Sequence, residues 1–247
     1  MRKILAALVL SLLTLQGCSW IKSWGDPDPG DPAPLVEFEE ALSVKKVWST
    51  SVGDGMGKQG LSMAPVFSSG SLFTADYEGR LTVVNAENGS KTLELKTKQA
   101  FSGGPGLDER HIYMGTIDGR VIAYDRNNGA EIWNAQVSSE VLAPPASADG
   151  VVVVRCFDGR VFGLDQDNGR RIWIYDHSVP LLTLRGNADL LVRAGSAFVG
   201  YDDGSVVSLR VADGSVVWNQ TIASPDGRTE LDRLADIGSQ MVIIASD

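Results

Sequence analysis

Cysteine and histidine are scarce in this chain of 247 residues, which contains two of each. Two cysteines, Cys18 and Cys156, are too few for a disulfide framework or a cysteine metal cluster. Two histidines, His111 and His177, are too few for a histidine-rich metal site. We therefore expect no bound metal ion and no cofactor.

Basic residues are also few, with 22 Lys and Arg against 31 Asp and Glu, which gives a net charge of −9. They form no cluster along the chain. Because affinity for nucleic acid depends on neutralising phosphates with Lys and Arg, this composition disfavours a nucleic-acid-binding protein.

Long apolar runs are absent apart from residues 4–15, which follow Arg2 and Lys3. Twelve residues are too few to cross about 30 Å of hydrocarbon as a helix, so the pattern is typical of an export signal. Proline is concentrated at residues 26–34, where four prolines alternate with three aspartates and predict an extended spacer. We therefore predict a signal peptide at 1–17, a tether at 18–44 and a partial propeller domain, as argued next, at 45–247.

Glycine is plentiful, with 27 residues, and many of these recur at fixed intervals. Four successive units carry an Asp–Gly or Glu–Gly pair and, ten residues later, an Asn–Gly or Asp–Gly pair. The first pair ends at Gly79, Gly119, Gly159 and Gly204, and the second at Gly89, Gly129, Gly169 and Gly214. Both series keep spacings of 40, 40 and 45 residues, a period typical of propeller blades.

Each unit predicts four short antiparallel strands around these turns. Asn–Gly and Asp–Gly between β-prone runs are strong hairpin signals, since both central positions of the favoured turn need positive φ. The outermost strand carries Trp133, Trp173 and Trp218 in three units and Leu93 in the first. The innermost strand is short, at 64–67, 105–107, 144–146 and 190–192. The predicted fold class is all-β, a β-propeller of about four complete four-stranded antiparallel blades plus partial strands.

Partial repeats flank the four units. Residues 44–52, with Trp48, are expected to form an outer strand of the kind that completes the last blade and closes a propeller ring. Residues 240–245 are expected to form the first strand of a fifth blade. We therefore interpret the chain as the N-terminal part of a longer propeller, whose open edges would favour aggregation.

Leu15-Gln16-Gly17-Cys18 directly follows the apolar run and resembles the lipobox of bacterial lipoproteins. The resemblance implies that Cys18 is acylated, as in palmitate-bearing lipoproteins, and becomes the first residue of the mature chain. Ser19 in the next position implies the outer rather than the inner membrane. A plain signal peptide with an incidental cysteine is the alternative.

The lipobox, the tether and the repeats, which are of quinoprotein type, together resemble the BamB family of outer-membrane assembly lipoproteins. Family members have eight blades and carry L-x-L-R-G and E-[IL]-D-R-[LM]-x-D-x-D in two loops outside the repeat. This chain carries Leu-Thr-Leu-Arg-Gly at 182–186 and Thr-Glu-Leu-Asp-Arg-Leu-Ala-Asp-Ile at 229–237. Gly238 replaces the second family aspartate, which weakens the acidic half of the site.

The resemblance implies a non-enzymatic scaffold subunit of the β-barrel assembly complex, lipid-anchored at the periplasmic face of the outer membrane. Family members use the two loops to bind the periplasmic domains of the central barrel subunit. Carried over residue by residue, the partner-binding residues are Leu182, Leu184, Arg185 and Asp236. Other assembly lipoproteins and unfolded outer-membrane proteins are further expected partners. Without the resemblance, leucines that fold inward and an arginine that is merely solvated explain the first loop more simply.

A quinone-dependent dehydrogenase is the main alternative, because such enzymes share the repeat. They need a closed ring, a calcium site and usually two adjacent cysteines, whereas Cys156 lies alone in an apolar strand and is expected to be buried and inert. Asp118, Asp158 and Asp203 occupy the same turn position, so local hydrogen bonding explains them better than catalysis. Neither histidine has a partner at triad or ligand spacing, and we expect no enzyme activity.

Overall fold

The computed structural model describes residues 42–55, 57, 61, 63–180, 188–224 and 241–242, together with Val36. The chain divides into two compact units, Met1–Lys45 and Lys46–Asp247, and the strands of the described residues all belong to the second. None of the described residues is helical, so the described part of the chain contains no helix that could cross a membrane. The signal peptide and tether boundaries remain predictions.

The described strands form four antiparallel sheets of four strands, each a meander that follows chain order. Blade 1 contains β1 (Val66–Ser68), β2 (Ser71–Ala75), β3 (Arg80–Asn85) and β4 (Lys91–Lys96). Blade 2 contains β5 (Phe101–Leu107), β6 (His111–Thr116), β7 (Arg120–Asp125) and β8 (Glu131–Gln136). Blade 3 contains β9 (Ala146–Ala148), β10 (Val151–Arg155), β11 (Val161–Asp165) and β12 (Arg171–Tyr175). Blade 4 contains β13 (Leu191–Arg193), β14 (Ser196–Gly200), β15 (Ser205–Arg210) and β16 (Val216–Thr221).

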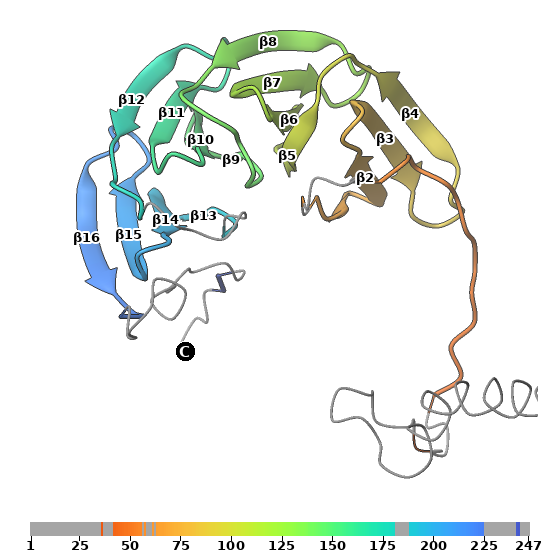
Figure 1. The fold of residues 1–247 in the computed structure, drawn as a ribbon. Helices are drawn as coiled ribbons and strands as arrows, with labels where there is room; N and C mark the ends of the chain where they lie inside the picture. Colours follow the sequence, from red (N-terminus) through yellow and green to blue (C-terminus); the bar gives the residue numbers. More distant parts are fainter. Residues whose placement is uncertain are drawn as a thin grey trace, which may run out of the picture. The chain divides into compact units, whose positions relative to one another are not determined.

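The blades follow one another around an arc, with β5, β9 and β13 on its inner side and β4, β8, β12 and β16 on its outer side (Figure 1). The predicted all-β propeller of four-stranded blades is confirmed. The innermost strands lie near the predicted positions with shifted bounds, and β5 begins earlier than expected because its backbone pairs with β6 from Phe101 onward.

The hydrophobic core lies between neighbouring blades rather than within one sheet. Val152 and Val154 of β10 belong to a buried cluster with Trp133 of blade 2, whereas Val151 and Val153 belong to a cluster with blade 4. Alternate side chains of a strand point to opposite faces of its sheet. A strand within the stack is therefore apolar on both faces, which explains the uninterrupted run of valines.

A tryptophan–glycine contact recurs between blades. Trp133 of β8 donates a hydrogen bond from Nε1 to the Gln166 carbonyl oxygen of blade 3 at 2.9 Å. Its ring covers Gly169, where an added Cβ would lie 2.5 Å from the indole. Trp173 covers Gly214 of blade 4 in the same way. Gly169 and Gly214 therefore serve both the turn, with φ near +70°, and the close approach of an indole from the preceding blade.

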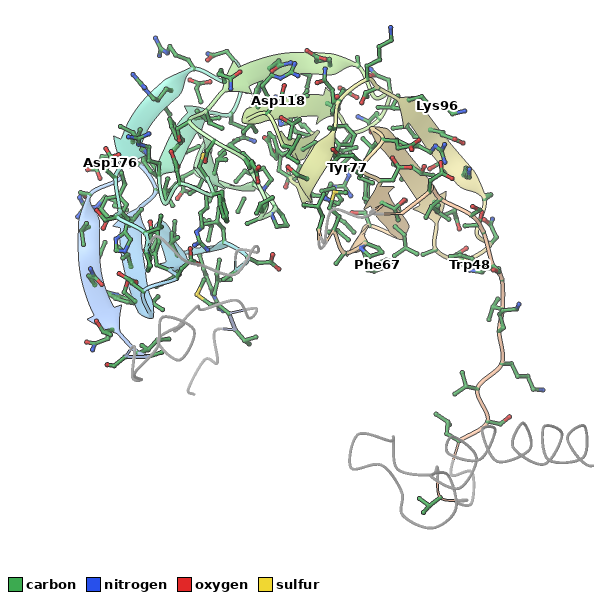
Figure 2. All side chains as sticks on the ribbon, viewed as in Figure 1. Trp48, Phe67, Tyr77, Lys96, Asp118 and Asp176 are labelled. Atoms are coloured by element: carbon green, nitrogen blue, oxygen red, sulfur yellow. The ribbon has the colours of Figure 1, made fainter. Side chains whose placement is uncertain are left out.

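Trp48 makes this contact with blade 1, beside which it is labelled in Figure 2. Its Nε1 donates to the Ala86 carbonyl oxygen at 2.9 Å, and its ring covers Gly89. The expected strand at 44–52 was wrong, because this segment forms no backbone ladder with any strand in the described part of the chain. The segment nevertheless occupies the position of an outer strand from a preceding blade. The predicted strand at 240–245 lies outside the described residues except for 241–242, which are not in a strand.

Blade 1 has Leu93 at the tryptophan position, paired with Val83 as Trp133 is paired with Ala123, but another leucine makes the contact with the next blade. Leu95, rather than Leu93, covers Gly129 of blade 2, where an added Cβ would lie 2.6 Å from Cδ2 of the leucine. A leucine cannot donate the hydrogen bond that the indole makes. A separate polar link joins these two blades, since Arg126 Nη2 donates to Ser68 Oγ at 2.8 Å.

The glycine turns differ from the predicted two-residue form. At Gly119 only the glycine has positive φ, and its N–H bonds to the Thr116 carbonyl oxygen at 3.2 Å, the pattern of a longer loop ending in a left-handed residue. Turn aspartates and asparagines accept backbone N–H groups within these loops and stabilise the longer form. Turns with two consecutive positive φ values occur instead at Ser69–Gly70, Asp149–Gly150 and Ala194–Gly195.

Cys156 is fully buried between blades 2 and 3. Burial raises the pKa of its thiol to about 11, so little reactive thiolate exists at neutral pH. The expected buried core cysteine is confirmed.

Candidate partner-binding rim

The sequence-predicted site residues, Cys18, Leu182, Leu184, Arg185 and Asp236, lie outside the described residues, and their roles remain predictions. The structure describes the chain on both sides of the first predicted loop, up to residue 180 and from residue 188. It also describes the approach to the second loop, up to residue 224. The geometry of these flanking residues shows from which side of the blades each loop departs.

Both loops depart from the side of the blades that carries the first glycine series, which we name the Asp–Gly rim after the turns ending at Gly79, Gly119, Gly159 and Gly204. Beyond β16, Ile222 N–H donates to the Gly204 carbonyl oxygen at 2.9 Å. Beyond β12, the His177 carbonyl oxygen lies against Gly159, where a Cβ would overlap it. The opposite rim carries the turns Ser69–Gly70, Asp149–Gly150 and Ala194–Gly195.

A polar hollow of about 300 Å³ lies on the Asp–Gly rim where the chain leaves blade 3. It is lined by Asp158, Arg160, Asp176, His177 and Ser178. Arg160 pairs with Asp176 at 2.6 Å and with Asp158 at 3.1 Å, so its guanidinium is held by carboxylates from the turn and from the strand exit. The hollow therefore presents carboxylates and a neutralised arginine rather than an unpaired cation.

His177 links the exit of blade 3 to the Asp–Gly turn of blade 4. Its ring stacks on Tyr201 with centroids 3.8 Å apart and an interplanar angle of 24°. Its Nε2 lies 2.9 Å from Asp203 Oδ2. Burial raises the pKa of Asp203, but hydrogen bonds from Ser205 and from the imidazole outweigh burial and lower it overall. The carboxylate is therefore the favoured form beside the histidine.

The turn aspartates bond locally, as the sequence predicted. Asp158 accepts the Arg160 N–H at 3.2 Å, and Asp203 accepts the Ser205 N–H at 2.9 Å. The described residues contain no group of three or more His, Cys, Asp or Glu side chains arranged to hold a metal ion.

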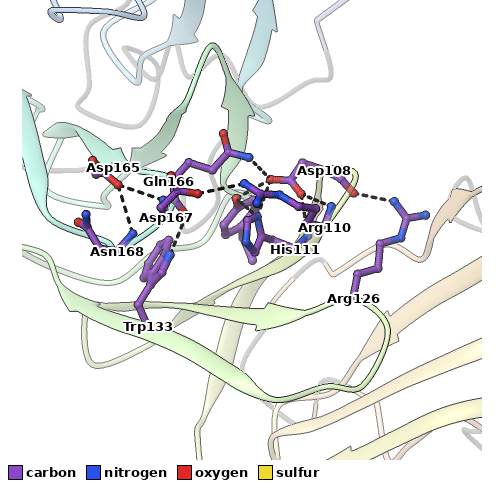
Figure 3. Close-up of polar contacts among 10 residues, drawn as sticks. Asp108, Arg110, His111, Arg126, Trp133, Asp165, Gln166, Asp167 and Asn168 are labelled. Carbon is purple, nitrogen blue, oxygen red and sulfur yellow. Dashed lines mark hydrogen bonds and ion pairs between the residues drawn. The ribbon is translucent and has the colours of Figure 1, made fainter.

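A second polar network joins blades 2 and 3 on the opposite rim (Figure 3). Asp108 Oδ2 accepts hydrogen bonds from the Tyr113 hydroxyl and the Gln166 amide, both at 2.6 Å, and lies 3.0 Å from His111 Nδ1. Burial would raise the pKa of Asp108, but hydrogen bonds from the Tyr113 and His111 side chains and from two backbone N–H groups lower it to about 2. Burial raises the pKa of Tyr113 well above its ordinary value. Asp108 is therefore a carboxylate at neutral pH, and it accepts hydrogen bonds from side chains of both blades.

Replacing Asp108 with asparagine is expected to remove a pH-dependent part of the stability. The folded pKa of about 2 lies below the ordinary 3.8, so the unfolded chain binds more protons in between. The carboxylate therefore stabilises the fold above about pH 4, and this contribution is lost as pH falls toward 2. Urea unfolding from pH 2 to 6 should show the largest difference between wild type and variant at pH 6. A difference that does not change with pH would contradict this assignment.

The two histidine–aspartate pairs were missed at the level of sequence. Asp108 lies three residues before His111, and this short spacing across a strand connection was a usable signal. His177 and Asp203 are 26 residues apart and come from different blades, so only the packing of blade 4 on blade 3 brings them together. Each histidine therefore has one aspartate partner that the sequence analysis did not identify.

Comparisons with known proteins agree with this architecture. A family model described as outer membrane protein assembly factor BamB matches residues 92–246. Among relatives carrying that name, one from Pseudomonas aeruginosa is 48% identical over 96% of this chain and 62% of its own length. Another from Xanthomonas campestris is 37% identical over 98% of this chain and 64% of its own length. The chain therefore spans slightly less than two thirds of the length of these curated relatives.

Among solved structures, BamB from Moraxella catarrhalis superposes with a TM-score of 0.68 and 28% identity, covering 74% of this chain and 55% of that protein. A quinohemoprotein alcohol dehydrogenase from Comamonas testosteroni superposes with a TM-score of 0.53 at 18% identity, covering 66% of this chain and 35% of that protein, which indicates a shared fold alone. By family match and by the identity of its relatives, the chain belongs to the outer membrane protein assembly factor BamB family.

Proposed function

We propose that this protein is a non-enzymatic scaffold of the outer-membrane β-barrel assembly complex, binding the periplasmic domains of the central barrel subunit through the Asp–Gly rim of blades 3 and 4. Other assembly lipoproteins and unfolded outer-membrane proteins are further proposed partners. The observation that carries the proposal is the common departure side of the two loops, at His177 and at Ile222, in a chain of this family.

Two loops on one rim suit the binding of a partner. Residues 181–187 supply two leucines beside an arginine, which combines apolar contact with a forked donor, both frequent features of interface hot spots. Residues 225–240 supply Asp236. The hollow at the exit of blade 3 adds Asp158 and Asp176, so a partner surface with basic and apolar groups would complement this rim.

The second proposed element is the anchor. Cys18, at the end of a lipobox-like tetrapeptide, is proposed to carry acyl chains that hold the protein at the periplasmic face of the outer membrane. Each buried CH₂ contributes about 0.8 kcal/mol, and several chains together give stable attachment. The intact mass of the exported protein should correspond to an acylated chain beginning at Cys18, and Cys18→Ser should release the protein from membranes. An unmodified mass would contradict this element.

Replacing Leu182, Leu184 and Arg185 together with glutamate is expected to abolish co-purification of the barrel subunit with the full-length, membrane-anchored protein. Loss of a hot-spot cluster typically weakens binding by several kcal/mol, which is a factor of 100 or more in affinity. The control is Asp149→Arg in a turn of the opposite rim, which should leave co-purification unchanged. Equal recovery of the barrel subunit with the triple variant would refute the proposed site.

A further inference from the structure

We infer that His177 is a positioning residue for partner binding: it fixes the point at which the chain leaves blade 3 for the leucine–arginine loop. This inference rests on the proposed function. It is carried by described residues on both sides of the joint between blades 3 and 4, namely 177–179 on one side and 201–203 on the other.

The exit segment is held at three points. The His177 ring is stacked on Tyr201 and bonded to Asp203, both of blade 4. Its carbonyl oxygen lies against Gly159 of blade 3, whose φ of +91° and lack of Cβ permit the approach. Val179 packs against the cluster between these blades and also contacts the Gly159 position. The direction of the backbone three residues before Leu182 is therefore set by blade 4 as well as by blade 3.

Other contacts also hold the two blades together. Arg155 and Asp202, both buried, form an ion pair across the same joint at 3.3 Å. Trp173 donates its Nε1 hydrogen bond to the Val211 carbonyl oxygen of blade 4 at 2.8 Å. Because these links do not involve His177, its loss should free the exit segment while the blades stay packed. A variant at His177 can therefore test the positioning of the loop separately from the stability of the fold.

The chain contains a matched control in its other histidine. His111 is also paired with an aspartate and lies near a tyrosine, with its ring centroid 5.6 Å from that of Tyr113. It lies in the network of the opposite rim, far along the chain from both loops. Replacing it should disturb stability without altering the exit of blade 3.

The test measures the affinity of the full-length protein for the purified periplasmic domains of the barrel subunit. His177→Ala should weaken binding about tenfold, the scale of one hydrogen bond to a charged group, with a small change in melting temperature. His177→Gln, which keeps a donor near Nε2, should recover most of the loss. His111→Ala should lower the melting temperature. It should leave the affinity within about twofold of wild type, well below the tenfold loss expected for His177→Ala.

A double-mutant cycle decides between positioning and an independent effect. Leu184→Ala should weaken binding strongly, and adding His177→Ala should then cost nothing more, because the contact that His177 positions is already lost. Fully multiplicative losses, or equal losses for His111→Ala and His177→Ala, would overturn the inference while leaving the proposed function intact. Failure of the wild-type protein to bind the domains would overturn both. If His177→Ala does not fold, Asp203→Asn replaces it in the same cycle with the same expected result.

Discussion

Replacing Trp133 with alanine is expected to lower the free energy of unfolding by about 3–5 kcal/mol, the range for truncating a buried tryptophan. The side chain is 7% exposed and belongs to the cluster between blades 2 and 3. The variant loses the hydrogen bond to the Gln166 carbonyl oxygen and leaves Gly169 without the ring that covers it. Because folded domains are stable by only about 5–15 kcal/mol, this single change should remove a large share of the total.

The matched control is Ile132→Ala, at the neighbouring position of β8. Ile132 is 41% exposed, and its truncation should change the unfolding free energy by about 1 kcal/mol or less. Urea unfolding monitored by far-UV circular dichroism, rather than by tryptophan fluorescence, distinguishes the two variants. Comparable losses for both would contradict the claim that the indole, rather than the outer strand in general, joins the blades.

Replacing Gly106 with alanine should be nearly as damaging, although only one methyl group is added. A Cβ at this position of β5 would overlap the Pro145 carbonyl oxygen, which belongs to the segment leading into β9. Since the clashing atom is backbone, it cannot move aside by a change of rotamer, and the two inner strands must separate. Overpacking of this kind costs about 1–3 kcal/mol and occasionally more, and we expect the upper end.

Gly150→Ala is the control for this second prediction. Gly150 has φ of +78° but no atom within 4 Å of an added Cβ, so only the left-handed backbone is penalised, at roughly 1–2 kcal/mol. Gly106 is not in the left-handed region. A larger thermal destabilisation for Gly150→Ala than for Gly106→Ala would show that backbone conformation, not close packing of inner strands, limits these glycines.

The repeat made the fold predictable because its signals are local in sequence. Gly119 and Gly129 mark the two ends of one strand, and a strand bounded by turns can be recognised without knowing its neighbours. The contact between Trp133 and Gly169 was not predicted, because it joins residues of two neighbouring blades. The contact of Leu95 with Gly129 could not be predicted, since it depends on which side chain reaches the turn of blade 2.

Turn geometry was predicted less well than strand order. Dipeptides such as Asp118–Gly119 favour two-residue turns in isolation, but here the aspartate accepts the Thr116 hydroxyl and the loop is longer. The true two-residue turns include Ala194–Gly195, a pair with no such signature. The neighbouring strands impose positive φ on the alanine, which a local propensity argument does not capture.

The residues of the candidate site were predicted from family motifs, whereas the contacts of the segments that flank them come from the structure. Leu182, Leu184 and Arg185 follow a motif that is readable in the sequence alone. The link between His177 and Asp203 depends on two blades packing face to face, so no sequence spacing reveals it. Function in this fold resides in loops that the blades hold in place, and we therefore propose that the blade joint positions the interface.

The most direct test of the central claim is site-specific photocross-linking in intact cells. A photoreactive residue at position 184, in the loop that follows blade 3, should cross-link to the central barrel subunit. The same residue at position 149, in the Asp149–Gly150 turn of the opposite rim, should give no such product. A cross-link from position 149 and none from position 184 would contradict the assignment of the Asp–Gly rim as the partner-binding surface.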